Sequence, residues 1–434
     1  MGKQRIAAEL GTAAALELSE LLLATTLEDA REWQGPVVIA PADSADAGWA
    51  ATLLPDAHVV PQLGANLGDR INHVDRQLRA AGARRIIYVG IDAPGHTAQT
   101  LADAQQALDH YDVVLLPARD GGVTLMGSRQ PWPELAELPW ETAQLCIRLR
   151  QTCEQAGEQM ALLAEGYDID RFADLLTALP ALREDKRPAR HALAAWTEDQ
   201  LSISIIIPVK QDTDALAELL EQLQVDLRGS DEILVVSAEQ SQASAEICSQ
   251  YGARLLHHQG SRGARMNRGA GAARNRILWF LHADAEPVAA APQIVRNTIG
   301  GGAAGGYFRF RFRGAAKLVK RALEACINFR TRFGIPYADQ GLFMTRLAFD
   351  DAGGFADQSL FEEVALVKAL RAHGQFIRLP ASLGVSPRRW ERDGWWRRTL
   401  HNRLLVLGYR LGVPNNTLAK IYRQADPAAD QRSR

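Results

Sequence analysis

The sequence predicts an α/β protein with two tandem domains, each built around a Rossmann-like, mainly parallel sheet. The chain has 434 residues, of which 47% are hydrophobic, enough for two ordinary domains with a core each. In both halves, apolar runs of strand length alternate with helical stretches, as expected of parallel sheets covered by helices. Between Pro180 and Gln200 the chain is charged, holds two prolines and has no strand pattern, which indicates a connection between domains.

The elements follow from these patterns in order. We expect a first domain over 1–180, with strands at 36–41, 84–92 and 112–118 and helices at 69–81 and 98–109. A linker over 181–200 leads to a second domain over 201–423, and 424–434 forms a polar tail. The second domain has predicted strands at 202–209, 232–237 and 277–283, and helices at 212–225, 241–251 and 265–275.

The composition excludes several classes. The chain carries 49 Lys+Arg against 51 Asp+Glu, a net charge of -2, so nothing in its balance favours nucleic acid as a partner. The four cysteines form no C-x-x-C pair, so neither a zinc site nor a disulfide framework is indicated. The N-terminus lacks a continuous apolar segment, and no window approaches the ~18 apolar residues of a spanning helix. We expect a cytoplasmic protein, at most peripheral at the inner membrane face.

Acidic residues stand at two positions suited to chemistry. The strand that begins at Ile277 is followed by His282 and Asp284, which places this aspartate at the carboxyl edge of the sheet, where open α/β folds bind ligands. Glu362 and Glu363 open a later helix, where a carboxylate can serve as a general base or simply complement the helix dipole. Together they suggest group transfer from a phosphate-activated donor.

Six blocks in the second half carry a family resemblance: ISIIIPV (203–209), SRGARMNRGA (261–270), FLHAD (280–284), PYADQGLF (336–343), FEEVALVKALRAHG (361–374) and RRWERDG (388–394). In this order they resemble family-2 glycosyltransferases of the arsenosugar-biosynthesis type, which have the GT-A fold. The resemblance covers roughly 203–423. It implies an inverting, metal-dependent transfer of a sugar from a nucleotide-sugar donor to a small-molecule or lipid-linked acceptor.

The resemblance also implies residue roles. Asp284 would hold Mg²⁺ or Mn²⁺, unless it only caps the turn before Pro287, and His282 would either ligate the ion or orient its surroundings. Glu363, beside Glu362, would take the proton of the acceptor hydroxyl. The remaining candidates are donor- or acceptor-binding residues: Asp212, Ser237, Glu239, Arg262, Arg265, Asn267, Asp339, Gln340, Arg389 and Trp390.

Several of these candidates have a structural alternative. The arginines can form a solvated basic face, Asp339 can stabilise a turn, and Trp390 can belong to the core. The segment Ser237 to Gln240 stands where the family usually has an aspartate that holds the nucleotide, so the chain departs from the family's donor-binding pattern at this point.

The segment 395–411 reads as a basic amphipathic helix. It can rest on an anionic membrane and meet a lipid-linked acceptor, or it can pack onto the sheet, and the second arrangement is the more common.

The first half resembles a bacterial family of glycosyltransferase-like or nucleotidyltransferase-like GT-A domains of unassigned activity, through fragments such as YVGIDAP (88–94), PARDGGVTLMG (117–127) and GYDID (166–170). Asp92 and Asp120 are its metal or phosphate candidates, with a plain β-turn as the alternative for Asp120. Members of that family begin with a strand that this half lacks, so we expect a structural or regulatory partner. The competing hypotheses are a GT-A binding or scaffold protein without catalysis, and a bifunctional nucleotidyltransferase-glycosyltransferase.

Overall fold

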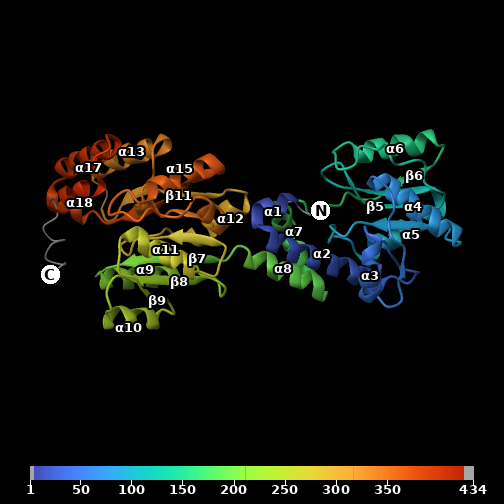
Figure 1. Ribbon diagram of the computed structural model, residues 1–434, viewed down its shortest axis with the longest axis horizontal. Coiled ribbons are helices and arrows are strands. Elements are labelled where there is room, and N and C mark those ends of the chain that lie inside the picture. Colours follow the sequence, from blue (N-terminus) through green and yellow to red (C-terminus); the bar gives the residue numbers. More distant parts are fainter. Residues whose placement is uncertain (1–3, 211, 316, 425–434) are drawn as a thin grey trace. The chain divides into compact units, whose positions relative to one another are not determined.

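The computed structural model describes residues 4–210, 212–315 and 317–424, so most of the expected polar tail lies outside the described residues. The chain divides into two compact units, Met1–Thr197 and Glu198–Arg434 (Figure 1). Each unit has its own sheets and its own helices.

The C-terminal unit is built on a seven-stranded sheet with the order β13-β11-β12-β10-β7-β8-β9. Only β12 runs antiparallel to its two neighbours, and the other pairings are parallel. The strands are β7 (Ile203–Val209), β8 (Glu232–Ser237), β9 (Arg254–His257), β10 (Ile277–Phe280), β11 (Gly305–Phe312), β12 (Phe343–Thr345) and β13 (Phe376–Val385). This mixed, mainly parallel sheet confirms the predicted fold class.

Helices follow the strands as the alternating pattern predicts. They are α9 (Thr213–Gln224), α10 (Gln242–Gln250), α11 (Arg262–Ala272), α12 (Ala291–Gly300), α13 (Leu318–Phe333), η2 (Ala338–Gln340), α14 (Arg346–Asp351), α15 (Glu363–His373), α16 (Arg388–Asp393), α17 (Trp395–Arg410) and α18 (Asn415–Gln424). β7 and β10 are buried along their whole length, because helices cover both faces of the sheet. The central core joins β7, β8 and β10 to α11, α14 and α15.

The N-terminal unit repeats part of this strand order. Its four-stranded sheet has the order β3-β5-β4-β6, in which β5 is antiparallel to both neighbours and β4 and β6 are parallel, as in the series β10-β12-β11-β13. A separate parallel pair, β1 and β2, matches β8 and β9. Among the described residues, no strand of this unit takes the place that β7 holds between β8 and β10. The strands are β1 (Val38–Ile39), β2 (His58–Val59), β3 (Ile86–Val89), β4 (Val113–Pro117), β5 (Val123–Ser128) and β6 (Met160–Leu162).

The helices of this unit include the segment expected as a linker. They are α1 (Gln4–Leu10), α2 (Thr12–Glu32), η1 (Ser44–Asp46), α3 (Ala47–Leu53), α4 (Leu67–Ala80), α5 (Ala98–His110), α6 (Leu145–Gln155), α7 (Phe172–Glu184) and α8 (Pro188–Asp199). Arg190 of α8 is buried and ion-paired with Glu28 (2.9 Å) and Asp29 (2.7 Å) of α2. The charged stretch 181–200 is therefore mostly helical, and ion pairs of Arg187 and Arg190 hold it against α2 of the N-terminal unit.

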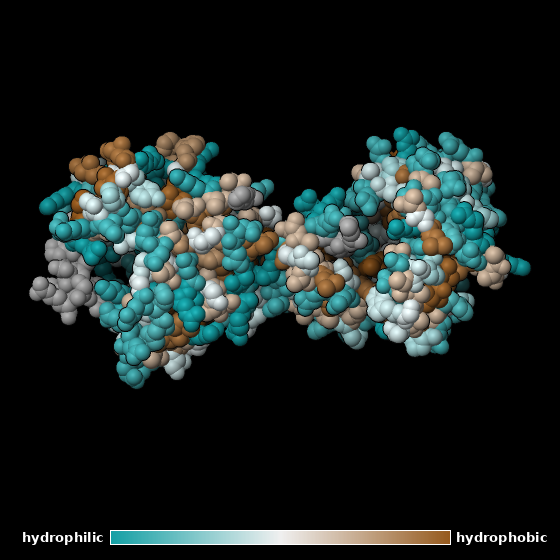
Figure 2. All heavy atoms as spheres, viewed as in Figure 1, coloured by the Kyte–Doolittle hydropathy of each residue, from teal (hydrophilic) through white to brown (hydrophobic). Residues whose placement is uncertain are grey.

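The helix expected over 395–411 forms, but the preference for packing its apolar side onto the sheet was wrong. Trp396, Leu400, Leu404 and Leu407 of α17 are each more than half exposed. Figure 2 shows hydrophobic side chains gathered on the surface where Figure 1 draws α13 and α17. The described residues contain no helix whose length and apolar content would let it cross a membrane.

Candidate active site

Most of the acids that the sequence singled out meet at the carboxyl edge of the large sheet. Asp212 follows β7, and Asp284 follows the neighbouring β10. Asp339 lies in η2. Its pKa is lowered by the charges of Arg262, Arg330 and Arg389 and raised by the charge of Asp284. Residues far apart in the sequence thus form one charged site at the position where open α/β sheets bind ligands.

The acidic pair at the start of α15 is held in a constrained backbone. Phe361, which directly precedes it, has φ of 60°, a region that non-glycine residues rarely adopt. Glu362 is completely buried, and its Oε1 accepts a hydrogen bond from Arg262 Nε at 2.5 Å. Glu363 is 2% exposed, and its Oε2 has no hydrogen-bond partner among the described residues. Glu362 Oε2 likewise has no partner among the described residues, so the two carboxylates differ in that Arg262 fixes Glu362 through its Oε1. Glu363 is therefore the better candidate to meet a substrate.

Burial and like charge shift the protonation of this pair. Burial, followed by the neighbouring Glu362, raises the pKa of Glu363 to about 8, against the lowering effect of Arg262. Burial also raises the pKa of Asp339 to about 6, although Arg262 and Arg330 oppose this change. Perturbed carboxyl groups of this kind cluster at catalytic sites, where a general base needs a pKa near the working pH.

His282 is engaged by an arginine. Its Nε2 lies 3.1 Å from Arg262 Nη1, and because a guanidinium only donates, the ring accepts this hydrogen bond. Burial, with Arg262 and Arg389 nearby, holds the pKa of His282 well below its usual range. A cation on this ring nitrogen would have to displace Arg262. Between the two roles left open by the sequence, the contact favours the orienting one.

The Asp284 carboxyl group fits a divalent cation. Burial raises its pKa, Arg389 lowers it, and the charge of Asp212 raises it again. Mg²⁺ and Mn²⁺ prefer carboxylate oxygens and commonly take one or two carboxylates together with substrate phosphates. A cation beside Asp284 and Asp212 would therefore relieve the repulsion between the two acids.

Several other candidates make structural contacts. Arg265 Nη1 donates to the carbonyl of Val209 at the end of β7, and the Asn267 side chain makes two hydrogen bonds with the backbone of Phe355. Gln340 is fully buried and donates to the Phe308 carbonyl. These three side chains hold the loops around the site in position.

The donor and acceptor candidates at the edges of the site also have defined places. The Ser237 hydroxyl donates to the carbonyl of Glu239 at 2.6 Å and is buried at the end of β8. Trp390 packs edge-on against Phe312, with ring centroids 5.0 Å apart, which is the core arrangement left open by the sequence. Arg389 donates a hydrogen bond to the hydroxyl of Tyr422, and its positive charge lowers the pKa of Asp284 and of Asp339.

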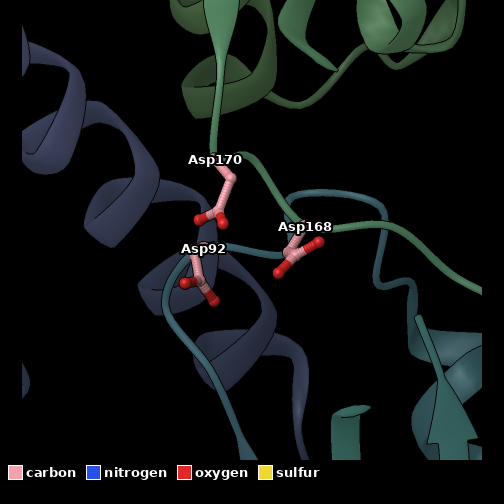
Figure 3. Close-up of side chains that lie close together, drawn as sticks. All are labelled: Asp92, Asp168 and Asp170. Carbon is pink, nitrogen blue, oxygen red and sulfur yellow. The ribbon is translucent and has the colours of Figure 1, made fainter. Parts of the chain in front are cut away.

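The N-terminal unit holds a second acidic group. Asp92, in the loop after β3, lies with Asp168 and Asp170 such that one carboxylate oxygen of each falls within 4.8 Å of the others (Figure 3). The two segments are joined by a hydrogen bond from the Ile169 amide to the Asp92 carbonyl at 2.9 Å. Burial and the charges of Asp120 and Asp92 raise the pKa of Asp168 to about 6. Three carboxylate oxygens at this spacing suit a hard divalent cation.

Sequence reasoning found Asp92 and Asp120 but missed Asp168 and Asp170. The available signal was the alternating pair in GYDID (166–170), which places two acids at one chain turn. Asp120 accepts a hydrogen bond from the Gly122 amide at 2.9 Å, which is the turn role left open by the sequence. Its charge also raises the pKa of Asp168. Tyr337 and Arg330, which flank Asp339 and Glu363, were missed as well.

Comparison with known families separates the two units. Residues 204–328 match the family described as glycosyl transferase family 2, and residues 23–142 match an uncharacterized protein family conserved in bacteria, DUF2064. No curated protein matches the chain. The first match confirms that the C-terminal unit is a glycosyltransferase.

Several solved structures are similar to parts of the chain. A putative nucleotide-diphospho-sugar transferase from Desulfovibrio desulfuricans G20 is 23% identical, with a TM-score of 0.42, over 46% of this chain and 88% of that one. Mannosyltransferase PcManGT from Pyrobaculum calidifontis, in complex with GDP-Man and Mn²⁺, is 13% identical, with a TM-score of 0.38, over 60% and 87%. Glucosyl-3-phosphoglycerate synthase from Mycobacterium tuberculosis is 15% identical, with a TM-score of 0.37, over 55% and 85%.

Proposed function

We propose that the C-terminal unit is an inverting, metal-dependent glycosyltransferase that moves a sugar from a nucleotide-sugar donor to an acceptor hydroxyl. The observation that carries this proposal is Glu363, a buried carboxylate with an unpartnered oxygen and a raised pKa beside Asp339. The assignment to the arsenosugar-biosynthesis type rests on the six sequence blocks alone.

Each residue of the site has a separate role in a single displacement. Glu363, as carboxylate, takes the proton of the acceptor hydroxyl, whose oxygen forms the new bond at the anomeric carbon as the bond to the diphosphate breaks. One displacement inverts the anomeric configuration. Arg262 holds Glu362 and His282 in place, so that Glu363 keeps its orientation. Asp284, with Asp212, would hold Mg²⁺ or Mn²⁺, which when bound neutralises charge on the leaving diphosphate.

Replacement of the proposed base tests this mechanism. We expect Glu363→Gln to lower kcat at least about a hundredfold while the affinity for the donor stays nearly unchanged, because the amide cannot accept the proton. The matched control is Glu246→Gln on the exposed face of α10, which should leave kcat unchanged. The donor is first identified by thermal shift with UDP-, GDP- and dTDP-sugars, with and without Mn²⁺. Turnover of the Glu363→Gln variant at the native rate would remove Glu363 from the mechanism.

The aspartate group of the N-terminal unit supports a second candidate function, a metal-dependent nucleotidyl transfer that makes an activated sugar. Three carboxylate oxygens within 4.8 Å of one another are the specific observation in its favour. In calorimetry of the full chain, we expect Asp168→Asn to weaken Mn²⁺ uptake at the aspartate group of the N-terminal unit. Asp284→Asn, which changes the site of the C-terminal unit, should leave the uptake at the N-terminal group in place. Pyrophosphate release from a nucleoside triphosphate and a sugar phosphate would then be the activity to measure. Equal Mn²⁺ uptake by the native chain and the Asp168→Asn variant would exclude this candidate.

A further inference from the structure

The exposed side of α17 has a regular pattern. Its apolar side chains follow one another every three or four residues, at Trp396, Leu400, Leu404, Leu407 and the adjoining Leu411, and each is more than half exposed. At about 100° per residue, these five side chains fall within a sector of roughly 80°. The exposed arginines 397, 403 and 410 lie at the two borders of this sector. Such a stripe, flanked by arginines and open to solvent, is not a core-facing surface.

α13 presents the same pattern. Leu318, Phe329 and Phe333 are each more than two-thirds exposed and fall on one side of the helix, with Arg321 and Arg332 exposed along its border. The opposite side of α13 packs through Val319, Leu323 and Ile327 on the cluster formed with Phe310 and Phe312.

The two helices belong to one surface. Trp395, at the start of α17, packs on that same cluster, and the Lys320 ammonium of α13 lies 5.8 Å from its ring centroid. Further along the two helices, the positive charges of Arg403 and Arg410 of α17 lower the pKa of Arg330 of α13. Figure 2 shows hydrophobic side chains over both helices. We call this surface, made of the exposed sides of α13 and α17, the α13–α17 face.

The charge of the α13–α17 face is of one sign. The sequence of α17 contains no acidic residue, and the only acid of α13, Glu324, accepts a hydrogen bond from the Phe312 amide. A second copy of the chain would bring the same arginines face to face. An anionic surface with an apolar interior instead matches both the leucine and aromatic stripes and the arginines beside them.

We propose that the α13–α17 face docks this protein on an anionic lipid bilayer, with the apolar stripes in the headgroup boundary and the flanking arginines on lipid phosphates. The docking does not depend on the proposed transfer reaction. The face nevertheless lies near the site of that reaction. Arg330 lies over the ring of Tyr337, 4.4 Å from its centroid, and the charges of Glu363 and Asp339 raise the pKa of Tyr337. The flank of the face therefore adjoins the candidate base.

Vesicle flotation with the full chain tests the proposal. We expect binding to phosphatidylcholine vesicles that contain phosphatidylglycerol, weaker binding to phosphatidylcholine alone, and a decrease with added salt. Leu400→Glu combined with Leu404→Glu should lower the partition coefficient at least about tenfold, since it places charge in the stripe. Arg403→Gln combined with Arg410→Gln should lower it about fivefold per arginine on anionic vesicles only.

The control is Val225→Glu, at the end of α9, where an apolar residue even more exposed than Leu400 and Leu404 lies outside the face. It should bind vesicles like the native chain. Unchanged melting temperatures and donor binding would show that the face variants are folded and that docking is separate from catalysis. Absence of vesicle binding by the native chain overturns the proposal. So does a native dimer that dissociates in the leucine variant without any vesicle binding, because the face would then serve a second copy.

Discussion

Glu363 combines burial with an unpartnered oxygen, so its protonation should control the rate. With a pKa of about 8, it is mostly protonated at pH 7 and becomes a base as the pH rises. We expect kcat/KM to increase with pH through about 8, because only the carboxylate can accept the acceptor proton. Asp339→Asn should lower this midpoint, since it removes a negative charge that raises the pKa of Glu363. A rate independent of pH between 6 and 9 would contradict the prediction.

His96 makes the N-terminal unit sensitive to acid. Burial, and then the charge of Arg190, lowers the pKa of His96 to about 4, from 6.5 in the unfolded chain. The folded state binds fewer protons, so this stability is complete above pH 6.5 and is lost as the pH falls toward 4. We expect the free energy of unfolding to fall by about 2 kcal/mol between pH 7 and 5, measured by urea denaturation. His96→Gln should reduce this dependence by that amount, and an unchanged slope would refute the assignment.

Single residues show why the site was partly readable from the sequence. Asp284 and the acidic pair follow a strand end and open a helix, and both positions are set by local patterns. Asp168 and Asp170 were missed because their role depends on Asp92, which lies far away in the sequence. The contact of Arg262 with both Glu362 and His282 likewise arises only in the tertiary structure.

At the scale of elements, the side chain of Asn267 links α11 to the loop before α15 by two hydrogen bonds. Asn267 donates to the Phe355 carbonyl at 2.8 Å and accepts from the Phe355 amide at 2.9 Å. We expect Asn267→Ala to cost about 1–3 kcal/mol of unfolding free energy, because it leaves both backbone groups unpaired. Arg268→Ala, one residue away and exposed, serves as the control and should change stability little. Equal stability of the two variants in chemical denaturation would show that water replaces the amide.

The strands were the easiest elements to predict. β7, β8 and β10 are mainly apolar runs, which are typical of buried parallel strands. The segment that contains α8 was predicted to be a linker because it is charged, holds prolines and has no strand pattern, whereas in the structure Arg190 is ion-paired inside the unit. For α17 the period was right and the direction of the apolar side was not, since periodicity alone does not show what lies opposite a stripe.

At the scale of the whole molecule, two units with separate cores should unfold separately. With Mn²⁺ present throughout, we expect two transitions in calorimetry, of which only one rises when the nucleotide sugar is added, because the ligand stabilises the unit that binds it. Arg190→Ala should lower the other transition and cost about 3–5 kcal/mol, since Glu28 and Asp29 lose a buried partner. His191→Ala, an exposed neighbour on α8, is its control. A single transition shifted by both changes would show that the units fold as one.

Cys326 is a native site for chemical labelling of the α13–α17 face. Of the four cysteines, all among the described residues, Cys146, Cys153 and Cys248 are buried, and burial raises the pKa of each thiol. Cys326 is exposed on α13 between Leu318 and Phe329. A maleimide dye should therefore couple at one position without any engineering. With an environment-sensitive dye, a shift of the emission wavelength would then report, in real time, whether this helix moves from water into an apolar phase.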